Sequence, residues 1–329
     1  MTGDFLQALE IRDFKCFEQL LVPLAPLTVM TGLNGAGKST AIQPLLLLAQ
    51  AARRQTWNCD AKFGDLPLNG EIVRLGTAGD VVRAGSANSE ISFELSGYGK
   101  SLKVSAKAKS GARSLSVTNN GGESVAWPEL QRVLSSRLVH LGAVRGGPKE
   151  AFPAPDHVLN QVRDVGVDGR FASHWYQELA DTTIEPSRCH PKETADSFRK
   201  QVDAWLNCLA PGANANVISL SAVSMFALQF RTSEIGEWKQ PANVGYGLTY
   251  AFPIIVALLA AEPGDVLVID SPEAHLHPQA QSQMGRLLAR VAAAGVQILV
   301  ETHSDHVLNG LRLAVREQLL PPTTRSLSN

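Results

Sequence analysis

The sequence has no excess of charge of either sign and no apolar run long enough to cross a membrane. Among its 329 residues, 30 are lysine or arginine and 31 are aspartate or glutamate, so the formal net charge is -1. Because the charges balance, the surface as a whole does not attract a polyanion such as nucleic acid. Binding of a polyanion would require a local basic patch. The most apolar run, residues 252–261, is about half a bilayer span and contains Pro253. We therefore expect no membrane partner.

Cysteine is scarce, and several common architectures have no signature here. The four cysteines, at positions 16, 59, 189 and 208, include no C-x-x-C pair, so neither a zinc ribbon nor a disulfide scaffold is supported. No heptad repeat is present, which excludes a long coiled coil. The first residues lack the basic and apolar segments of an export signal. Together with the ordinary content of 44% hydrophobic residues, this favours a globular, cytoplasmic protein.

The order of the predicted elements favours an α/β fold with a parallel sheet. Apolar runs and helical periodicity predict strands at 5–11, 27–31, 216–222, 225–231, 265–270 and 296–301, and helices at 38–53, 192–209, 248–261, 278–294 and 305–318. Within the first of these helices, Pro44 removes a hydrogen-bond donor, so we expect a kink or an early break there.

Residues 90–118 follow a different pattern. Three alternating segments separated by Gly, Ser and Asn turns predict an antiparallel meander. Its middle strand places Lys103, Ser105, Lys107 and Lys109 on one face. Such a row of lysines is ordinarily a solvated face, and contact with nucleic-acid phosphates is the alternative.

A glycine-rich segment carries the strongest motif. Residues 32–39 match G-x-x-x-x-G-K-[ST] between an apolar strand and a helix, which is the context that this phosphate-binding loop requires. Lys38 would supply positive charge to the β- and γ-phosphates and Ser39 a hydroxyl to Mg²⁺. The glycines let the backbone wrap closely around the phosphates. The residues expected at the phosphates are Asn34, Gly35, Ala36, Gly37, Lys38, Ser39 and Thr40.

Acidic and histidine residues follow two later strands. Asp270 ends the strand predicted at 265–270, where P-loop proteins place an acid that holds Mg²⁺. His303 follows the next strand, and ligands gather at the carboxyl ends of parallel strands. We therefore expect Gly37, Asp270 and His303 to converge. A metal cluster formed by His275, His277, His303 and His306 with Glu273 and Asp305 is an alternative, as are capping and packing roles.

Taken together, these motifs resemble those of the ABC-type ATPases of the SMC/RecF clade, and within it the OLD-like AAA ATPases. The segments that carry the resemblance are 9–40, with the phosphate loop, 243–279, with D-S-P-E followed by H-L-H-P, and 295–315, with T-H-S. The resemblance implies a P-loop fold of ABC type with a mixed central sheet, an antiparallel β subdomain and a helical insertion lobe. It also implies ATP and Mg²⁺ as cofactors.

The resemblance assigns roles to further residues. Residues 243–248 stand where the ABC signature reaches a partner's γ-phosphate, and Gly245 and Gly247 fit close approach of the backbone. The signature serine is absent, and a plain loop before a helix is the alternative. His303 resembles the switch histidine. Ser271 stands where many relatives have the catalytic glutamate, so we expect Glu273 to take that role and hydrolysis to be slow.

Three divisions of the chain follow: 1–150 with the phosphate loop and β subdomain, 151–215 as the insertion lobe, and 216–329 with the signature-like segment, Asp270 and His303. The two ends are expected to form one nucleotide site. The family resemblance implies an ATPase that dimerises head to tail in anti-phage defence or DNA repair, with a partner effector such as a nuclease and possible contact with DNA or RNA. The alternatives are an ATP-gated scaffold that barely hydrolyses ATP, and a nuclease that uses the histidine cluster.

Overall fold

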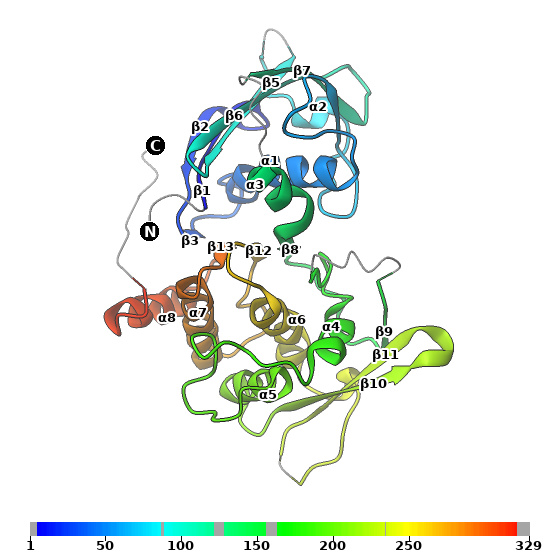
Figure 1. Cartoon of the computed structure of the whole chain (residues 1–329), viewed down its shortest axis with the longest axis vertical. Coiled ribbons are helices and arrows are strands. Elements are labelled where there is room, and N and C mark those ends of the chain that lie inside the picture. Colours follow the sequence, from blue (N-terminus) through cyan, green and yellow to red (C-terminus); the bar gives the residue numbers. More distant parts are fainter. Residues whose placement is uncertain (1–4, 87–88, 122–127, 156–162, 234, 321–329) are drawn as a thin grey trace. The chain divides into compact units, whose positions relative to one another are not determined.

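The computed structural model describes residues 5–86, 89–121, 128–155, 163–233 and 235–320 (Figure 1). The chain divides into two compact units, the first built from Met1–Leu138 and Thr323–Asn329 and the second from Val139–Pro322. The three-part division at residues 150 and 215 stays a prediction.

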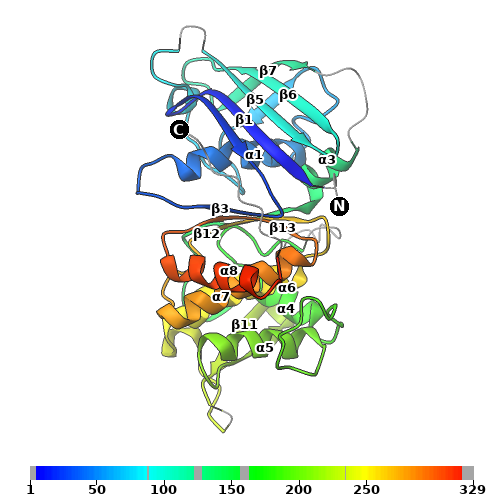
Figure 2. The ribbon, with the colours of Figure 1, turned by 90° about the vertical axis from the view of Figure 1, so that its left-hand side faces the viewer.

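The first unit contains a six-stranded antiparallel sheet in the order β2-β1-β5-β6-β7-β4. Strands β1, β5, β6 and β7 of this sheet are labelled in Figure 2. Its β5–β6 hairpin pairs Gly97 with Lys100, and β7 continues the meander, which confirms the prediction for 90–118. The strands are β1 (Leu6–Phe14), β2 (Phe17–Pro23), β4 (Gly64–Pro67), β5 (Glu90–Gly97), β6 (Lys100–Lys107) and β7 (Ser114–Gly121).

The lysine face of the middle strand is only partly as predicted. Lys103 and Lys107 are exposed, and so is Lys109 beyond the end of β6. Ser105 is buried, and the pairing of β6 with β7 shifts register between Ser105 and Ala106. The exposed basic face is therefore interrupted at its centre.

Strand β3 (Leu27–Met30) and helix α1 (Lys38–Arg53) flank the glycine-rich loop. The helix runs through Pro44 without a break, so the early break is wrong. The leucines at 45–48 are all buried, and their packing offsets the hydrogen bond that proline removes. The other helical segments of this unit are α2 (Ala78–Val81), α3 (Pro128–Arg132) and the π-turn η1 (Val133–Arg137).

The second unit contains the parallel strands β12 (Val266–Asp270) and β13 (Gln297–Glu301), which pair in register from Val266 with Gln297 to Asp270 with Glu301. Strand β8 (Leu138–Leu141) lies on the other side of β12. Helices α6 (Tyr246–Ala260), α7 (Pro278–Ala293) and α8 (Asp305–Arg316) alternate with these strands. All five elements between 246 and 316 lie within two residues of their predicted bounds.

A small antiparallel sheet in the order β10-β11-β9 accompanies two further helices. The predicted helix at 192–209 begins only at residue 198, because the chain before it pairs with residues 182–184: Ile184 N–H donates to Asp196 O and Phe198 N–H to Thr182 O, both at 2.8 Å. The elements are β9 (Ala151–Pro153), α4 (Ala172–Leu179), α5 (Phe198–Leu209), β10 (Asn214–Leu220), β11 (Met225–Arg231) and the 3₁₀ turns η2 (Ser221–Val223) and η3 (Pro241–Asn243).

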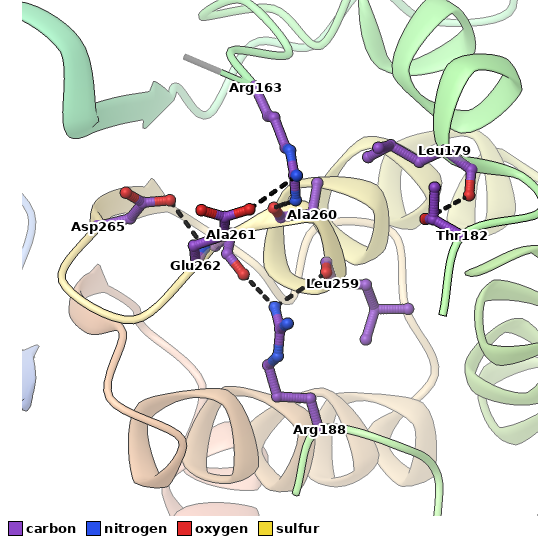
Figure 3. Close-up of polar contacts among 9 residues, drawn as sticks. All are labelled: Arg163, Leu179, Thr182, Arg188, Leu259, Ala260, Ala261, Glu262 and Asp265. Carbon is purple, nitrogen blue, oxygen red and sulfur yellow. Dashed lines mark hydrogen bonds and ion pairs between the residues drawn. The ribbon is translucent and has the colours of Figure 1, made fainter. Parts of the chain in front are cut away.

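Two arginine side chains fix the carboxyl end of α6 (Figure 3). The buried Arg188 donates to the carbonyls of Leu259 and Ala261, and Arg163 donates to that of Ala260 at 2.9 Å. Arg163 also pairs with Glu262 at 2.7 Å. The last carbonyls of a helix have no partner within it, so these charged donors hold α6 in place.

Among the described residues, no helix combines the length and apolar character needed to cross a membrane. None of the four cysteines, all of which the structure describes, forms a disulfide, and only Cys59 is buried.

Asp203 on α5 makes the stability of the second unit depend on pH. Burial raises the pKa of its carboxyl group to about 6, although the group accepts a hydrogen bond from Ala215 N–H. Because the folded-state pKa lies above the unfolded value, this carboxyl group stabilises the fold at low pH, and that contribution is lost as pH rises through 6.

We predict that Asp203→Asn, which keeps the acceptor, removes this dependence. When the pH is raised from 4 to 7, the free energy of unfolding of the wild type should fall by about 2 kcal/mol more than that of the variant. Urea unfolding at a series of pH values measures this difference. A difference that does not change with pH contradicts the assignment.

Candidate functional site

The glycine-rich loop of the first unit has the backbone of a phosphate cradle. Gly32, Gly35 and Gly37 have φ values of 140°, 80° and 87°. Residues with a side chain rarely adopt this left-handed region, so the conformation accounts for all three glycines. Asn34, Gly35 and Ala36 are exposed, and Gly37 is the N-cap of α1.

The side chains at the start of α1 suit an anion. Lys38 Nζ lies over the loop and donates to the carbonyls of Gly32 at 3.0 Å and Leu33 at 2.8 Å. Ser39 and Thr40 lie in the first turn, which contains no acidic residue. A helix N-terminus with a lysine and no competing carboxylate attracts phosphate groups.

In the second unit, the turn after β12 holds Asp270 in a defined orientation. Ser271 donates from its hydroxyl to Asp270 Oδ1 at 2.7 Å, and its backbone N–H donates to Glu301 O at 2.8 Å. Ser271 has a φ of 49°, which is uncommon for a residue with a side chain. Ser271 therefore orients the neighbouring carboxylate.

Glu273 is bound to the loop that follows the adjacent strand. Its Oε2 accepts from the Thr302 hydroxyl at 2.7 Å and its Oε1 from His303 N–H at 2.8 Å. The imidazole of His303 is exposed. The structure thus brings Asp270, Glu273 and His303 together within the second unit, at the carboxyl ends of two parallel strands.

Sequence reasoning missed Arg145, which lies in the segment after β8. Its Nη2 donates to the carbonyl oxygens of Asp270 at 2.6 Å and Ser271 at 3.0 Å. Burial lowers the pKa of its guanidinium to about 10, and the charges of Asp270 and Glu273 oppose that shift. The signal that could have found it is a basic residue soon after a short apolar run: Arg145 lies four residues past the end of β8, and Glu273 lies three residues past the end of β12.

The signature-like segment forms the N-terminus of α6. Gly245 is its N-cap, and a Cβ there would meet no atom within 4 Å. A Cβ on Gly247 would lie 2.8 Å from the carbonyl oxygen of His275. Gly247 is therefore required by close packing inside the unit, whereas Gly245 faces open space.

Two further histidines, His275 and His277, have structural roles. The His277 ring accepts from Gln279 N–H and caps α7, and the His275 ring packs edge-on against Tyr250 with centroids 4.5 Å apart. Across the described part of the chain, no group of three or more His, Cys, Asp or Glu side chains is arranged to hold a metal ion.

The loop, the strand-end carboxylates and the alternating helices define a P-loop ATPase. The profile of a family described as "AAA domain, putative AbiEii toxin, Type IV TA system" matches residues 27–124 and 192–309, more than half of the chain. The chain belongs to this AAA family.

The chain is similar to the OLD nuclease of Thermus scotoductus, with 24% identity over 336 residues. The match covers 91% of this chain and 59% of that nuclease, so the chain spans less than two thirds of its relative's length. This similarity confirms the predicted resemblance to OLD-like ATPases.

Solved structures confirm the fold class. An SMC head bound to the C-winged helix domain of ScpA aligns with a TM-score of 0.54 at 12% identity, over 93% of this chain and 92% of that one. A Pyrococcus furiosus Smc head with an extended coiled coil, bound to the C-terminal domain of ScpA, aligns at 0.52 and 12% identity, over 93% and 91%. The fold is that of ABC-type ATPase heads.

The two glycines of the signature-like segment should differ in their tolerance of a side chain. Gly247→Ala forces a methyl group against a backbone carbonyl, so we expect it to lower the free energy of unfolding by about 1–2 kcal/mol. Gly245→Ala is the matched control and should change it by less than about 0.5 kcal/mol. Chemical denaturation of both variants measures this, and equal stabilities contradict the packing role of Gly247.

Proposed function

We propose that the chain binds ATP at residues 32–40 and hydrolyses it slowly in the presence of Mg²⁺. Lys38 neutralises charge on the β- and γ-phosphates, and the oxygen atoms of Ser39 and Asp270 are ligands of the kind that Mg²⁺ prefers. Glu273 polarises the attacking water, and His303 contacts the γ-phosphate. The single observation that carries this proposal is the Glu273 carboxylate held by Thr302 and His303.

The residues fit both cofactors. For ATP, the glycines of the loop offer backbone without side chains, and a Cβ on Gly32 or Gly35 would meet no atom within 4 Å. For Mg²⁺, the donor set consists of a hydroxyl and a carboxylate, both hard oxygen ligands. When bound, the ion would neutralise charge that develops on the phosphates.

Slow hydrolysis is supported by the identity of residue 271. A serine cannot accept the proton of the attacking water, so we assign this role to Glu273, the carboxylate two residues further along. Because Glu273 makes two hydrogen bonds, its carboxylate is fixed in position. Loss or displacement of a general base typically costs about 10²–10⁴ in rate.

Nucleotide-dependent pairing of two copies, head to tail, is the second part of the proposal. Gly245 faces open space and Tyr246 is 55% exposed, so the start of α6 is accessible to a partner copy with its bound nucleotide. Light scattering with a slowly hydrolysed ATP analogue tests this pairing. The mass should double with the analogue, and an unchanged mass contradicts the dimer.

We propose a role in anti-phage defence or DNA repair, with a partner effector such as a nuclease. The similarity to the OLD nuclease supports this role. That nuclease is longer than this chain, and the match covers 59% of it. A direct DNA or RNA contact would be local, and the exposed Lys103 and Lys107 on β6 are the first residues to test. Stimulation of ATP turnover by DNA in the wild type, lost in a Lys103→Glu/Lys107→Glu variant, tests this contact; no stimulation contradicts it.

A second candidate function is an ATP-gated scaffold that binds and closes but does not turn over ATP. The presence of Ser271 rather than glutamate favours it. Phosphate release by the wild-type chain distinguishes the two functions, because a scaffold releases none over many binding cycles.

Lys38→Ala should lower ATP affinity by about tenfold or more and reduce turnover to background, because the phosphates lose their nearest cation. Calorimetry and phosphate release measure the two effects. The matched control is Lys62→Ala, an exposed lysine of the same unit. Unchanged affinity and turnover in Lys38→Ala would overturn the assignment of the site.

A further inference from the structure

The side chain of Arg145 is almost completely buried, which is unusual for an arginine. Only 4% of the residue is exposed, although a buried guanidinium loses strong hydration and is retained only where its charge and donors are used. Its Nη2 hydrogen bonds go to two consecutive backbone carbonyls, those of Asp270 and Ser271. These carbonyls lie where β12 ends and the turn toward Glu273 begins.

The rest of the guanidinium faces the second unit's interior. Its Nε and Nη1 are buried and have no hydrogen-bond partner among the described residues, and the same holds for the hydroxyl of Thr249. Arg145 and Thr249 both line a cavity of about 10 Å³, which is room for one water molecule. The ring of Tyr250 lies 5.8 Å from Arg145 Cζ.

Arg145 keeps its charge at neutral pH. Burial lowers its pKa to about 10, and Asp270, Glu273 and Tyr250 are close enough to oppose that shift. The guanidinium therefore combines two roles near the strand end: it donates to the backbone of the turn, and it places a positive charge beside the carboxylates.

We propose that Arg145 is a positioning residue for ATP hydrolysis, which fixes the turn after β12 and thereby the placement of the Asp270 and Glu273 carboxylates. This inference rests on the proposed ATPase function. A lysine is not equivalent, because Nη2 donates both hydrogen bonds from a rigid, planar guanidinium, whereas an ammonium rotates freely at the end of a flexible chain. Arg145 acts through these two residues and need not touch the nucleotide.

The chain offers a matched control in Arg188. It is also buried, at 8% exposure, and it also donates to two backbone carbonyls, those of Leu259 and Ala261 at the carboxyl end of α6 (Figure 3). If a decrease in kcat comes only from disturbing a buried arginine, it should be equally large in the variants at both positions.

The test compares Arg145→Lys with Arg188→Lys in the full chain, at a temperature at which both are folded by circular dichroism. We expect both to lower the unfolding midpoint. Only Arg145→Lys should lower kcat, by about tenfold or more, while KM stays within about twofold. If Arg145→Lys does not fold, Arg145→Gln, which keeps an N–H donor, takes its place.

A double-mutant cycle with Glu273→Gln adds a measurement that a purely structural role would not change. If Arg145 acts through the turn that carries Asp270 and Glu273, the effects of Arg145→Lys and Glu273→Gln on kcat are less than additive. Equal kcat in the Arg145 and Arg188 variants, or additive effects in the cycle, would overturn the inference while the ATPase function stands. A wild-type chain without turnover would instead overturn the proposed ATPase function, and this inference with it.

Discussion

The Glu273 carboxylate, held by the Thr302 hydroxyl and the His303 N–H, is the interaction on which the second unit's site depends. It joins the loops that follow two neighbouring parallel strands. The pairing of Asp270 with Glu301 brings both strand ends to the same level, so a side chain from one loop can reach the backbone of the other. A carboxylate that accepts two hydrogen bonds loses little further freedom when a substrate arrives.

The surrounding residues keep this geometry against local backbone strain. Ser271 and His275 have φ values of 49° and 62°, an uncommon region that persists only where neighbouring contacts demand it. Those contacts come from Glu301, which accepts from Ser271 N–H, and from Arg145, which donates to the carbonyl of Ser271. The close approach of Gly247 to His275 adds a third constraint, since α6 can pack there only without a side chain.

Local patterns in the sequence predict most of the fold, because the phosphate loop and the strands and helices from 246 to 316 depend on nearby residues. Local patterns do not predict features that depend on contacts between residues far apart in the sequence. The helix α5 starts late because residues 182–184 pair with the chain before it. Likewise, Arg145 reaches a turn 125 residues away, and no spacing rule connects the two. The local rule for proline counts only the hydrogen bond that Pro44 removes, whereas the buried leucines after it keep α1 continuous.

The central claim is that Glu273, rather than residue 271, activates water for ATP hydrolysis. The most direct measurement is steady-state phosphate release by Glu273→Gln, compared with the wild type after ATP affinity is shown to be equal by calorimetry. Glutamine keeps the size and one acceptor of the side chain but cannot take a proton. Turnover of Glu273→Gln should fall by about 10²–10⁴ relative to the wild type. Turnover equal to that of the wild type would contradict this claim.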